Sequence, residues 1–524
     1  MTTSSLADPP AQRSGSGHRH LGWALVLICL AQLMVVLDAS IANIALPFIQ
    51  HDLGFSASGL TWVVTGYSLT FGGLLLLGGR LGDLYGRRRI FMVGLIVFAI
   101  ASLVGGLAQD PGMLLTSRAV QGVGAALASP SALALITTTF PAGPARSRAF
   151  AVYAAMSGVG AAVGLILGGW LTGIHPGIDG WRLTFLINVP IGAIAAFLAP
   201  RVLAESDRHS GELDVPGGVT VTAGLLAIVY GLSRASTDGW SDTLTMTFLI
   251  AGAALIAIFL VIETRVAHPL MPLRVFASGT RAASYLVMML IPAAMFAMFY
   301  YLSQYVQEVK GYSPLHTGVA FLPFTVGLIV AATVTSNLVN RIDPRYIAGV
   351  GTLLAAAGLF IFSRIPSNTG FPVSGVTGSY VGHILPGILV MSIGMGMTFV
   401  TITLTAVHRL RAEDSGIGSG VLNTMQQVGG ALGLSILSTV AVHVMRNDLG
   451  SIGGAAAAAG QHVALTPGSP AYGQAFAHGA TTAFLVGSVM ALVGSLVVWV
   501  FLNVKHTELA EDSQAAGAEP VHVG

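Results

Sequence analysis

Charged residues are scarce in this 524-residue chain: Asp, Glu, Lys and Arg together make up 9% of it, against 54% hydrophobic residues. Because soluble domains carry about 25% charged residues, the composition excludes a soluble protein. The mean hydropathy of +0.77 is that of a polytopic membrane protein. The sequence pI of about 8.7 does not indicate a nucleic-acid-binding surface, because the basic residues are too sparse to form one.

Cysteine and lysine are almost absent. The single Cys29 excludes an intrachain disulfide and a thiolate metal cluster. Neither Lys310 nor Lys505 follows a glycine, so the chain has no P-loop, and no histidine precedes a glutamate, so it has no HExxH motif. We therefore expect no enzyme, no metal and no cofactor, and an energy source that is an ion gradient or the substrate's own gradient.

Apolar runs of about 20 residues, long enough for a helix to cross a bilayer, recur along the chain. They begin near Leu21, Ala57, Ile90, Met113, Ser147, Leu183, Pro216, Thr243, Ala282, Leu315, Tyr346, Tyr380, Ser415 and Thr481. These runs predict fourteen transmembrane helices. Counted on alternating sides, eighteen Lys and Arg residues lie on the side of the two termini and five on the other. The positive-inside rule then predicts a protein of the cytoplasmic (inner) membrane with both termini in the cytoplasm.

The chain is predicted to be an all-α integral membrane protein built from two halves. The loop GRLGDLYGRRR at 79–89 recurs in weaker form at 340–345, as expected for the internal repeats of secondary transporters. The first apolar run is too long for a signal peptide, so we expect an uncleaved first helix. The predicted divisions are a tail at 1–20, a six-helix bundle at 21–204, an inserted pair of helices at 205–281, a second six-helix bundle at 282–504 and a tail at 505–524.

Asp38 is the one acidic residue predicted to lie deep inside a span. A charge at the centre of a transmembrane helix costs about 2.5 to 3.5 kcal/mol, so such a residue is a candidate functional site. Asp38 lies roughly 12 Å from the outer end of its helix, and Arg118 of the fourth span lies roughly 9 Å from its own. Since the two depths are similar, the side chains could pair or share a water. We assign both to proton coupling.

A predicted substrate cavity combines residues of four spans. Methionine and aromatic side chains adapt to varied apolar ligands, although such a stripe on a helix more often serves packing. Asn43 is interpreted first as a group that hydrogen-bonds a neighbouring helix and second as a ligand contact. The predicted cavity residues are Met34, Gln121, Phe296, Tyr300, Gln304, Asn423, Gln426 and Gln427.

Two further groups of residues are assigned to the movement and packing of helices. The loop at 79–89 would lock helices together on the cytoplasmic side, since membrane topology alone requires neither its acid nor its glycines. Small residues in the fifth span would let helix backbones approach closely. The predicted gate residues are Gly79, Asp83, Gly86, Arg87 and Arg88, and the predicted packing residues are Gly160, Gly164, Gly168 and Gly169.

Six motifs carry a resemblance to a known family. They are LDASIANIALP (37–47), GRLGDLYGRRR (79–89), LLTSRAVQGVGAA (114–126), WRLTFLINVPIG (181–192), QYVQEVKGYSPLHTGVAFLP (304–323) and SGVLNTMQQVGGALG (419–433). Together they resemble the fourteen-spanner drug:proton antiporter branch, the multidrug efflux proteins, of the major facilitator superfamily. The resemblance implies an alternating-access exporter in which Asp38 and Arg118 are the first-span carboxylate and fourth-span arginine. One motif departs from the family, because Leu165 follows Gly164 where the family has proline.

We therefore expect proton-coupled efflux of lipophilic drugs and antibiotics by a monomer in the lipid bilayer. One carboxylate can neutralise one positive charge, so neutral and monocationic compounds are the expected substrates. An importer or uniporter of a small metabolite remains the alternative, since it would use the same fold. A non-transporting receptor fits poorly with a carboxylate and an arginine at similar depth. The Ala- and Gly-rich segment 450–473 is expected to be an extracytoplasmic loop.

Overall fold

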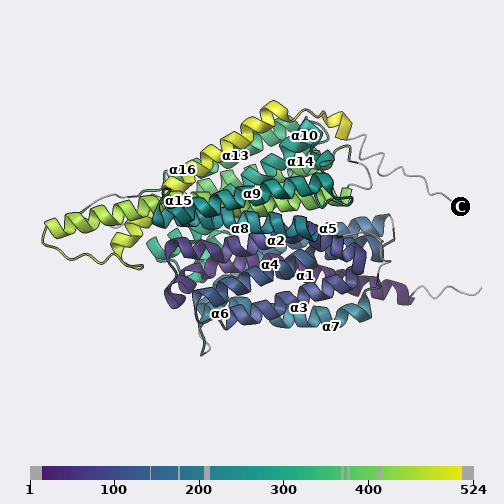
Figure 1. The fold of residues 1–524 in the computed structure, drawn as a ribbon, viewed down its shortest axis with the longest axis horizontal. Coiled ribbons are helices and arrows are strands. Elements are labelled where there is room, and N and C mark those ends of the chain that lie inside the picture. Colours follow the sequence, from purple (N-terminus) through teal and green to yellow (C-terminus); the bar gives the residue numbers. More distant parts are fainter. Residues whose placement is uncertain are drawn as a thin grey trace, which may run out of the picture.

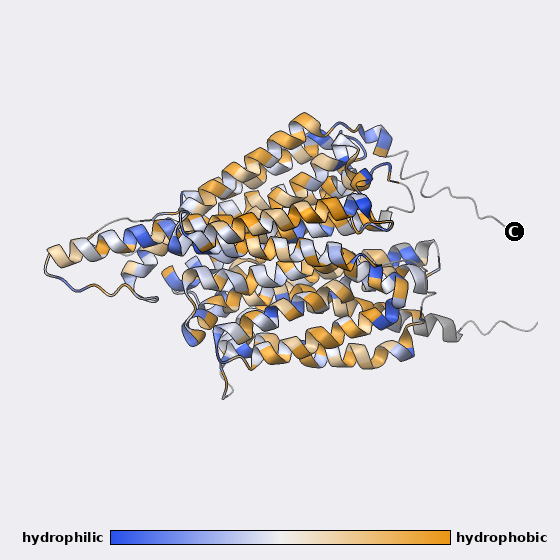
Figure 2. Ribbon diagram, in the orientation of Figure 1, coloured by the Kyte–Doolittle hydropathy of each residue, from blue (hydrophilic) through white to orange (hydrophobic). Residues whose placement is uncertain are grey.

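The computed structural model describes residues 15–141, 143–174, 177–205, 213–367, 371–373, 378–410 and 415–509. Within these ranges every regular element is a helix (Figure 1). Fourteen helical segments are long and apolar enough to cross a membrane, and apolar residues run along their length while hydrophilic ones gather near their ends (Figure 2). The chain is therefore a multi-pass membrane protein, and the predicted number of spans is confirmed.

The helices fall into two six-span bundles separated by one inserted pair. The first bundle contains α1 (Gly15–Leu53), α2 (Ala57–Tyr85), α3 (Arg87–Gly106), α4 (Pro111–Thr139), α5 (Pro144–Gly173), α6 (Gly180–Leu186) and α7 (Asn188–Val202). The inserted pair is α8 (Val215–Asp238) and α9 (Thr243–Arg265). The second bundle contains α10 (Gly279–Ala297), η2 (Met298–Leu302), η3 (Tyr305–Val309), α11 (Pro314–Ala320), α12 (Leu322–Leu338), α13 (Pro344–Ser363), η4 (Tyr380–Ile384), α14 (Leu385–Val407), α15 (Ser415–Ala458) and α16 (Pro470–Phe501), and a short 3-10 helix, η1 (Leu273–Phe276), precedes it.

One span boundary differs from its prediction. Thirteen predicted starts lie within three residues of the observed ones, but the last span begins at Pro470 rather than near Thr481. The predicted loop at 450–473 is shorter in the structure, at 459–469, because α15 continues to Ala458 and projects beyond the other helices (Figure 1) and α16 begins at Pro470. Alanine has the highest helix propensity, which favours the extension. The hydroxyl of Ser469 accepts a hydrogen bond from the Tyr472 N–H at 3.2 Å and caps α16.

The first residues of α1 and the last residues of α16 lie on the same side of the helices (Figure 1), here called the terminal side, and the opposite side is called the far side. The two bundles lie one above the other in this view, with α8 and α9 across the boundary between them. On the far side, the Arg446 guanidinium of α15 donates to the Thr237 carbonyl of α8 at 2.7 Å. A Cβ added to Gly73 of α2 would lie 3.2 Å from the Cβ of Thr222 of α8. The insertion therefore contacts one helix of each bundle.

Glycines let α5 pack tightly against α1. A Cβ built on Gly160 would lie 3.2 Å from Val36 Cβ, and one built on Gly168 would lie 3.0 Å from Ile41 Cα. At Gly164 the added carbon would collide with the hydroxyl of Ser40. At Gly169 it would lie 2.5 Å from the Pro314 carbonyl of α11, in the other bundle. All four predicted packing glycines thus lie at close helix contacts.

The family's proline position in α5 is filled by a buried leucine. Leu165 is 1% exposed, and α5 runs without interruption from Pro144 to Gly173. The carbonyl of Leu165 lies directly against Gly318 of α11, where a Cβ would collide with it. The uninterrupted helix therefore contacts the second bundle at this point through its backbone.

Two neighbouring glycines of α2 test whether close packing limits stability. We expect Gly78→Ala to lower the free energy of unfolding by about 1 to 3 kcal/mol, because the new Cβ would collide with the Ala126 carbonyl of α4. Gly79→Ala is the matched control, since its Cβ would lie 3.5 Å from Pro130 Cβ and alanine favours helix over glycine. The measurement is the apparent melting temperature of each variant in detergent. Equal melting temperatures for the two variants would contradict the expectation.

Candidate functional site

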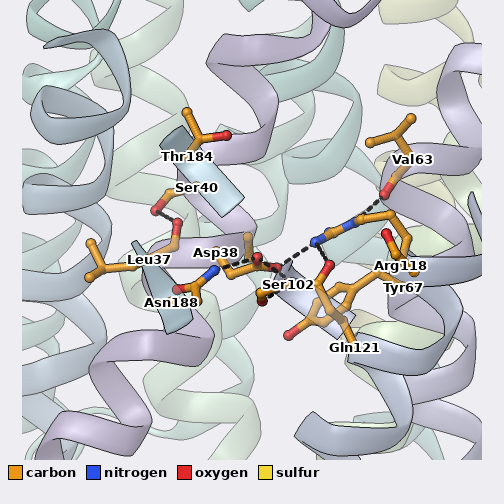
Figure 3. Close-up of polar contacts among 12 residues, drawn as sticks. Leu37, Asp38, Ser40, Val63, Tyr67, Ser102, Arg118, Gln121, Thr184 and Asn188 are labelled. Carbon is orange, nitrogen blue, oxygen red and sulfur yellow. Dashed lines mark hydrogen bonds and ion pairs between the residues drawn. The ribbon is translucent and has the colours of Figure 1, made fainter. Parts of the chain in front are cut away.

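Asp38 is buried in the first bundle, where its carboxylate accepts hydrogen bonds from three side chains (Figure 3). It is 2% exposed. Its Oδ2 accepts from Arg118 Nη1 of α4 at 2.5 Å. Its Oδ1 accepts from Gln121 Nε2 of α4 and from Asn188 Nδ2 of α7, both at 3.0 Å. Asp38 and Arg118 therefore form a direct ion pair, the first of the two arrangements that their predicted depths allowed.

Arg118 is also held by α2, and Gln121 links it to α3. Its Nε donates to the Val63 carbonyl of α2 at 2.8 Å, and its guanidinium lies 4.4 Å from the centre of the Tyr67 ring, one turn further along the same helix. Gln121 accepts from Arg118 Nη1 through its Oε1 at 3.0 Å and donates to Ser102 Oγ of α3 at 2.6 Å. The site thus joins α1, α2, α3, α4 and α7.

Two polar atoms beside this ion pair have no hydrogen-bond partner. They are the hydroxyl of Tyr67 and the side-chain oxygen of Asn188, and both are buried. Buried polar groups in proteins are nearly always hydrogen-bonded.

Asn188, Ser102 and Tyr67 are site residues that the sequence analysis did not assign. Asn188 begins α7 directly after the break between α6 and α7 at Ile187. It lies within the motif WRLTFLINVPIG, and it is the one amide of its apolar span. A polar side chain in such a span indicates an interhelical hydrogen bond, so Asn188 could have been found from its type and position. Ser102 and Tyr67 carry no comparable signal.

The predicted cavity residues are divided between two places. Gln121 lies at the Asp38 site, whereas Tyr300 and Gln304 line a small cavity of about 20 Å³ together with Tyr472 and Phe476 of α16. That volume holds roughly one water molecule. Gln304 Nε2 donates to the Tyr300 carbonyl at 3.2 Å. In this conformation the two groups of residues do not share one cavity.

The other predicted cavity residues mostly serve helix packing. Met34 is fully buried in the core of the first bundle, and its sulfur lies close to Gly192, which differs from the predicted cavity position. The Phe296 ring packs on Gly430 of α15. Of the three predicted amides of α15, Asn423 is exposed and Gln426 and Gln427 are half-buried. Bundle interiors fill with the bulkiest apolar side chains available, and the face of a helix alone does not distinguish a core from a cavity.

A proline in α1 provides a contact between the two bundles on the far side. Pro47 has no N–H, so the carbonyl four residues before it, that of Asn43, has no helical donor. Ser303 Oγ of the second bundle donates to this carbonyl at 3.0 Å. Gln307 Nε2 donates to the next carbonyl, that of Ile44, at 3.2 Å. The side chain of Asn43 donates within α1 instead, to the Ala39 carbonyl at 2.9 Å, which differs from the predicted interhelical bond.

The far-side contact continues beyond these two bonds. Gln50 Nε2 of α1 donates to Tyr472 Oη of α16 at 3.4 Å. Ser303 directly follows η2, and Gln307 lies within η3. Both segments are π-helical. Such segments often occur at functional sites in helices. The far side is therefore closed by side-chain hydrogen bonds between α1 and the second bundle.

The predicted gate loop is tied down within the first bundle. Arg87 donates to Asp83 Oδ1 through Nε at 3.1 Å and Nη2 at 3.0 Å. Its Nη1 also donates to the Ala134 carbonyl of α4 at 3.4 Å. Gly86 has a φ of 104°, a conformation that favours glycine. The Asp83–Arg87 pair thus joins α2, α3 and α4 of one bundle.

Arg88 and Glu205 form a second tie, which the sequence analysis did not predict. The backbone N–H of Arg88 donates to Glu205 Oε1 at 3.1 Å, and the side chains pair at 3.5 Å. In the second bundle the corresponding loop is tied by Asp343, which accepts from the backbone N–H of His506 at 2.9 Å and lies 2.7 Å from its Nδ1. Hydrogen bonds from His506 lower the pKa of Asp343. Each loop is therefore bound to the segment that follows the last helix of its own bundle.

The buried ion pair makes a double-variant test possible. We expect Arg118→Met to reduce the free energy of unfolding by about 3 to 5 kcal/mol, because it leaves Asp38 charged and uncompensated in an apolar bundle. Adding Asp38→Asn should recover much of this loss, since no charge then remains buried. Melting temperatures of the two single variants and the double variant give the coupling energy. Additive losses would show that the pair does not act as a unit.

Comparison with known proteins places this architecture in a family. The model of the Major Facilitator Superfamily matches residues 28–434. The puromycin resistance protein pur8 of Streptomyces alboniger is 40% identical over 95% of this chain and 94% of its own length. The cephamycin export protein CmcT of Amycolatopsis lactamdurans is 38% identical over 80% of this chain and 84% of its own.

A solved structure supports the same fold. A bacterial homolog of the human lysosomal transporter Spinster, in an inward-facing and unoccupied conformation, superposes with a TM-score of 0.68. The superposition covers 96% of this chain and 99% of that one at 15% identity. From the family match, its relatives and its fourteen spans, the chain is a transporter and belongs to the fourteen-span drug efflux branch of the Major Facilitator Superfamily.

Proposed function

We propose that this protein exports lipophilic, neutral or monocationic drug-like compounds in exchange for protons, by alternating access, as a monomer in the cytoplasmic membrane. The observation that carries the proposal is the buried ion pair of Asp38 and Arg118. The terminal side is the cytoplasmic side, because the count along the sequence assigns eighteen basic residues to the side of the termini and five to the other. Relatives named for puromycin resistance and cephamycin export support drug-like substrates.

Asp38 is the proton-carrying group in this mechanism. When it is charged, Arg118 neutralises it and α1 is bonded to α4. When it takes up a proton, the ion pair is lost, while Arg118 keeps its bond to the Val63 carbonyl and its place over the Tyr67 ring. Protonation therefore weakens the tie between α1 and α4. Moving one charge through 100 mV supplies about 2.3 kcal/mol, enough for a roughly 50-fold gradient of a neutral substrate.

Alternating access requires the far side to open. In the present conformation it is closed where Ser303 and Gln307 bond to the carbonyls of α1 before Pro47. Asp38 lies on the same helix, five residues before Asn43 and six before Ile44. A change in the bonding of Asp38 can therefore reach the far-side contact through α1. Release of substrate to the outside would follow when these bonds break.

The charge of the substrate is limited by the acids within its reach. Glu263 lies near the end of α9, where its carboxylate accepts from the Met271 N–H at 2.9 Å. Glu308 lies in η3 at the far-side end of its span. Asp38 is thus the acid at mid-depth in the described spans, with Tyr300 and Gln304 supplying aromatic and amide surface nearer the far side. A second positive charge on a substrate would enter without a partner.

Replacing the proton carrier tests coupling. We expect Asp38→Asn to abolish uphill efflux of ethidium in a pump-deficient host at preserved expression, because an amide does not exchange a proton. Asp83→Asn is the matched control. It should slow efflux by loosening the terminal-side tie, but the remaining efflux of ethidium should still run against its gradient and still depend on the proton gradient. The measurement is dye accumulation with and without a protonophore. Unchanged proton-driven efflux by Asp38→Asn would show that Asp38 is not the proton-carrying group.

A matched pair of dyes tests the limit on charge. Ethidium carries one permanent positive charge and propidium carries two on the same ring system. We expect propidium to be exported more slowly by roughly tenfold or more, because desolvating an unpaired second charge costs several kcal/mol. Inverted membrane vesicles, energised by an imposed pH gradient, give both rates and the direction of transport. Equal or faster transport of propidium would mean that another acid reaches the cavity.

A further inference from the structure

The amide of Asn188 is only half used by its surroundings. Its Nδ2 donates to Asp38 Oδ1 at 3.0 Å, and Figure 3 shows this group lying against the carboxylate on the side away from Arg118. Its own oxygen is buried and accepts no hydrogen bond. The residue is 0% exposed. A buried amide with one end bonded and the other unpaired has an unused hydrogen-bonding capacity beside the group that would bind the proton.

A protonated Asp38 would need an acceptor that it does not need when charged. A carboxylate only accepts hydrogen bonds, whereas a carboxylic acid also has one O–H to donate. Arg118 has no acceptor atom. The oxygen of Gln121 already accepts from Arg118 Nη1 at 3.0 Å. Of the three side chains that donate to Asp38, Asn188 alone has an oxygen without a donor.

We propose that Asn188 is a positioning residue that reports the protonation state of Asp38: its amide donates to the charged carboxylate and, after rotation by half a turn, accepts the O–H of the protonated acid. The proposal rests on the proposed function, in which Asp38 carries the proton. Because one amide can face Asp38 with either its donor or its acceptor, the O–H of the protonated acid is not left without an acceptor.

The groups facing Asp38 define what else could respond. Among the described residues, Arg118 from α4 is the charged group and Tyr67 from α2 is the titratable one. Gln121 from α4 and Asn188 from α7 are neutral amides that contact the carboxylate directly. On protonation α1 therefore loses its ion pair to α4 but keeps a hydrogen bond to α7. The amide therefore keeps α1 bonded to α7 when the ion pair between α1 and α4 is lost.

Infrared difference spectroscopy of the full-length protein in lipid vesicles tests this directly. Acidification should produce a carboxylic C=O band of protonated Asp38, identified by its absence in Asp38→Asn. In Asn188→Leu the carboxylate loses one donor and the protonated acid loses its acceptor, while Arg118 and Gln121 remain. Gln121→Met also removes one donor to the carboxylate, together with an acceptor of Arg118 Nη1, but leaves the oxygen of Asn188 in place. Loss of a donor raises the pH midpoint of the band in both variants. Because a buried O–H is left unsatisfied only in Asn188→Leu, we expect its midpoint to lie about one unit below that of Gln121→Met.

A midpoint of Asn188→Leu about one unit below that of Gln121→Met supports the proposal. Asn188→Ser, which keeps a group able to donate and to accept, should return the midpoint toward the wild-type value and provides a second variant should the leucine disturb folding. A midpoint of Asn188→Leu equal to or above that of Gln121→Met would overturn the role of Asn188 alone. A fall in Tyr67→Phe, together with equal midpoints in Asn188→Leu and Gln121→Met, would do the same by making Tyr67 the acceptor. A band that persists in Asp38→Asn would overturn the proton-carrying role of Asp38 and this proposal with it.

Discussion

A carboxylate can stay charged among apolar helices only while donors surround it, and this requirement organises the first bundle. Desolvation of an ion costs several kcal/mol even in a relaxed protein. Asp38 meets that cost with one guanidinium and two amides, and the guanidinium is itself fixed by α2. Removing any one of these partners leaves part of the desolvation cost of the carboxylate uncompensated. The site therefore binds α1, α4 and α7 to one another at this depth, in addition to their apolar contacts.

The bonds within each bundle differ in kind from those between bundles. Ion pairs on the terminal side join parts of one bundle: Arg87 with Asp83, and Arg88 with Glu205. The described far-side bonds between bundles are neutral, from Ser303 and Gln307 to backbone carbonyls. Neutral hydrogen bonds contribute about 1 kcal/mol each, so they can break repeatedly. The distribution is what two rigid bodies that separate and rejoin on one side require.

Sequence alone could predict the spans and the central pair, because hydropathy and depth are properties of one helix at a time. Counting residues from the helix ends puts Asp38 and Arg118 at similar depths, and in the structure they form an ion pair. The sequence predicts Met34 and Phe296 at a cavity because each shares a helix face with other candidate site residues, yet both pack in helix contacts. Whether a helix face meets solvent or a neighbour depends on how the bundles close. Glu205 was missed because it lies after the last helix of its bundle, and its partner is 117 residues away.

The two loop ties show what the internal repeat conserves. In the first bundle a base in the loop, Arg88, pairs with an acid after the last helix, Glu205. In the second bundle the acid, Asp343, is in the loop and its partner, His506, follows the last helix. A hydrogen-bonded pair forms equally well with the acid on either side of the contact. The repeat therefore preserves the connection rather than the residues, and a comparison of the two loops by residue identity alone finds only a weak copy. Both ties hold the loop against the segment that follows the last helix of its own bundle.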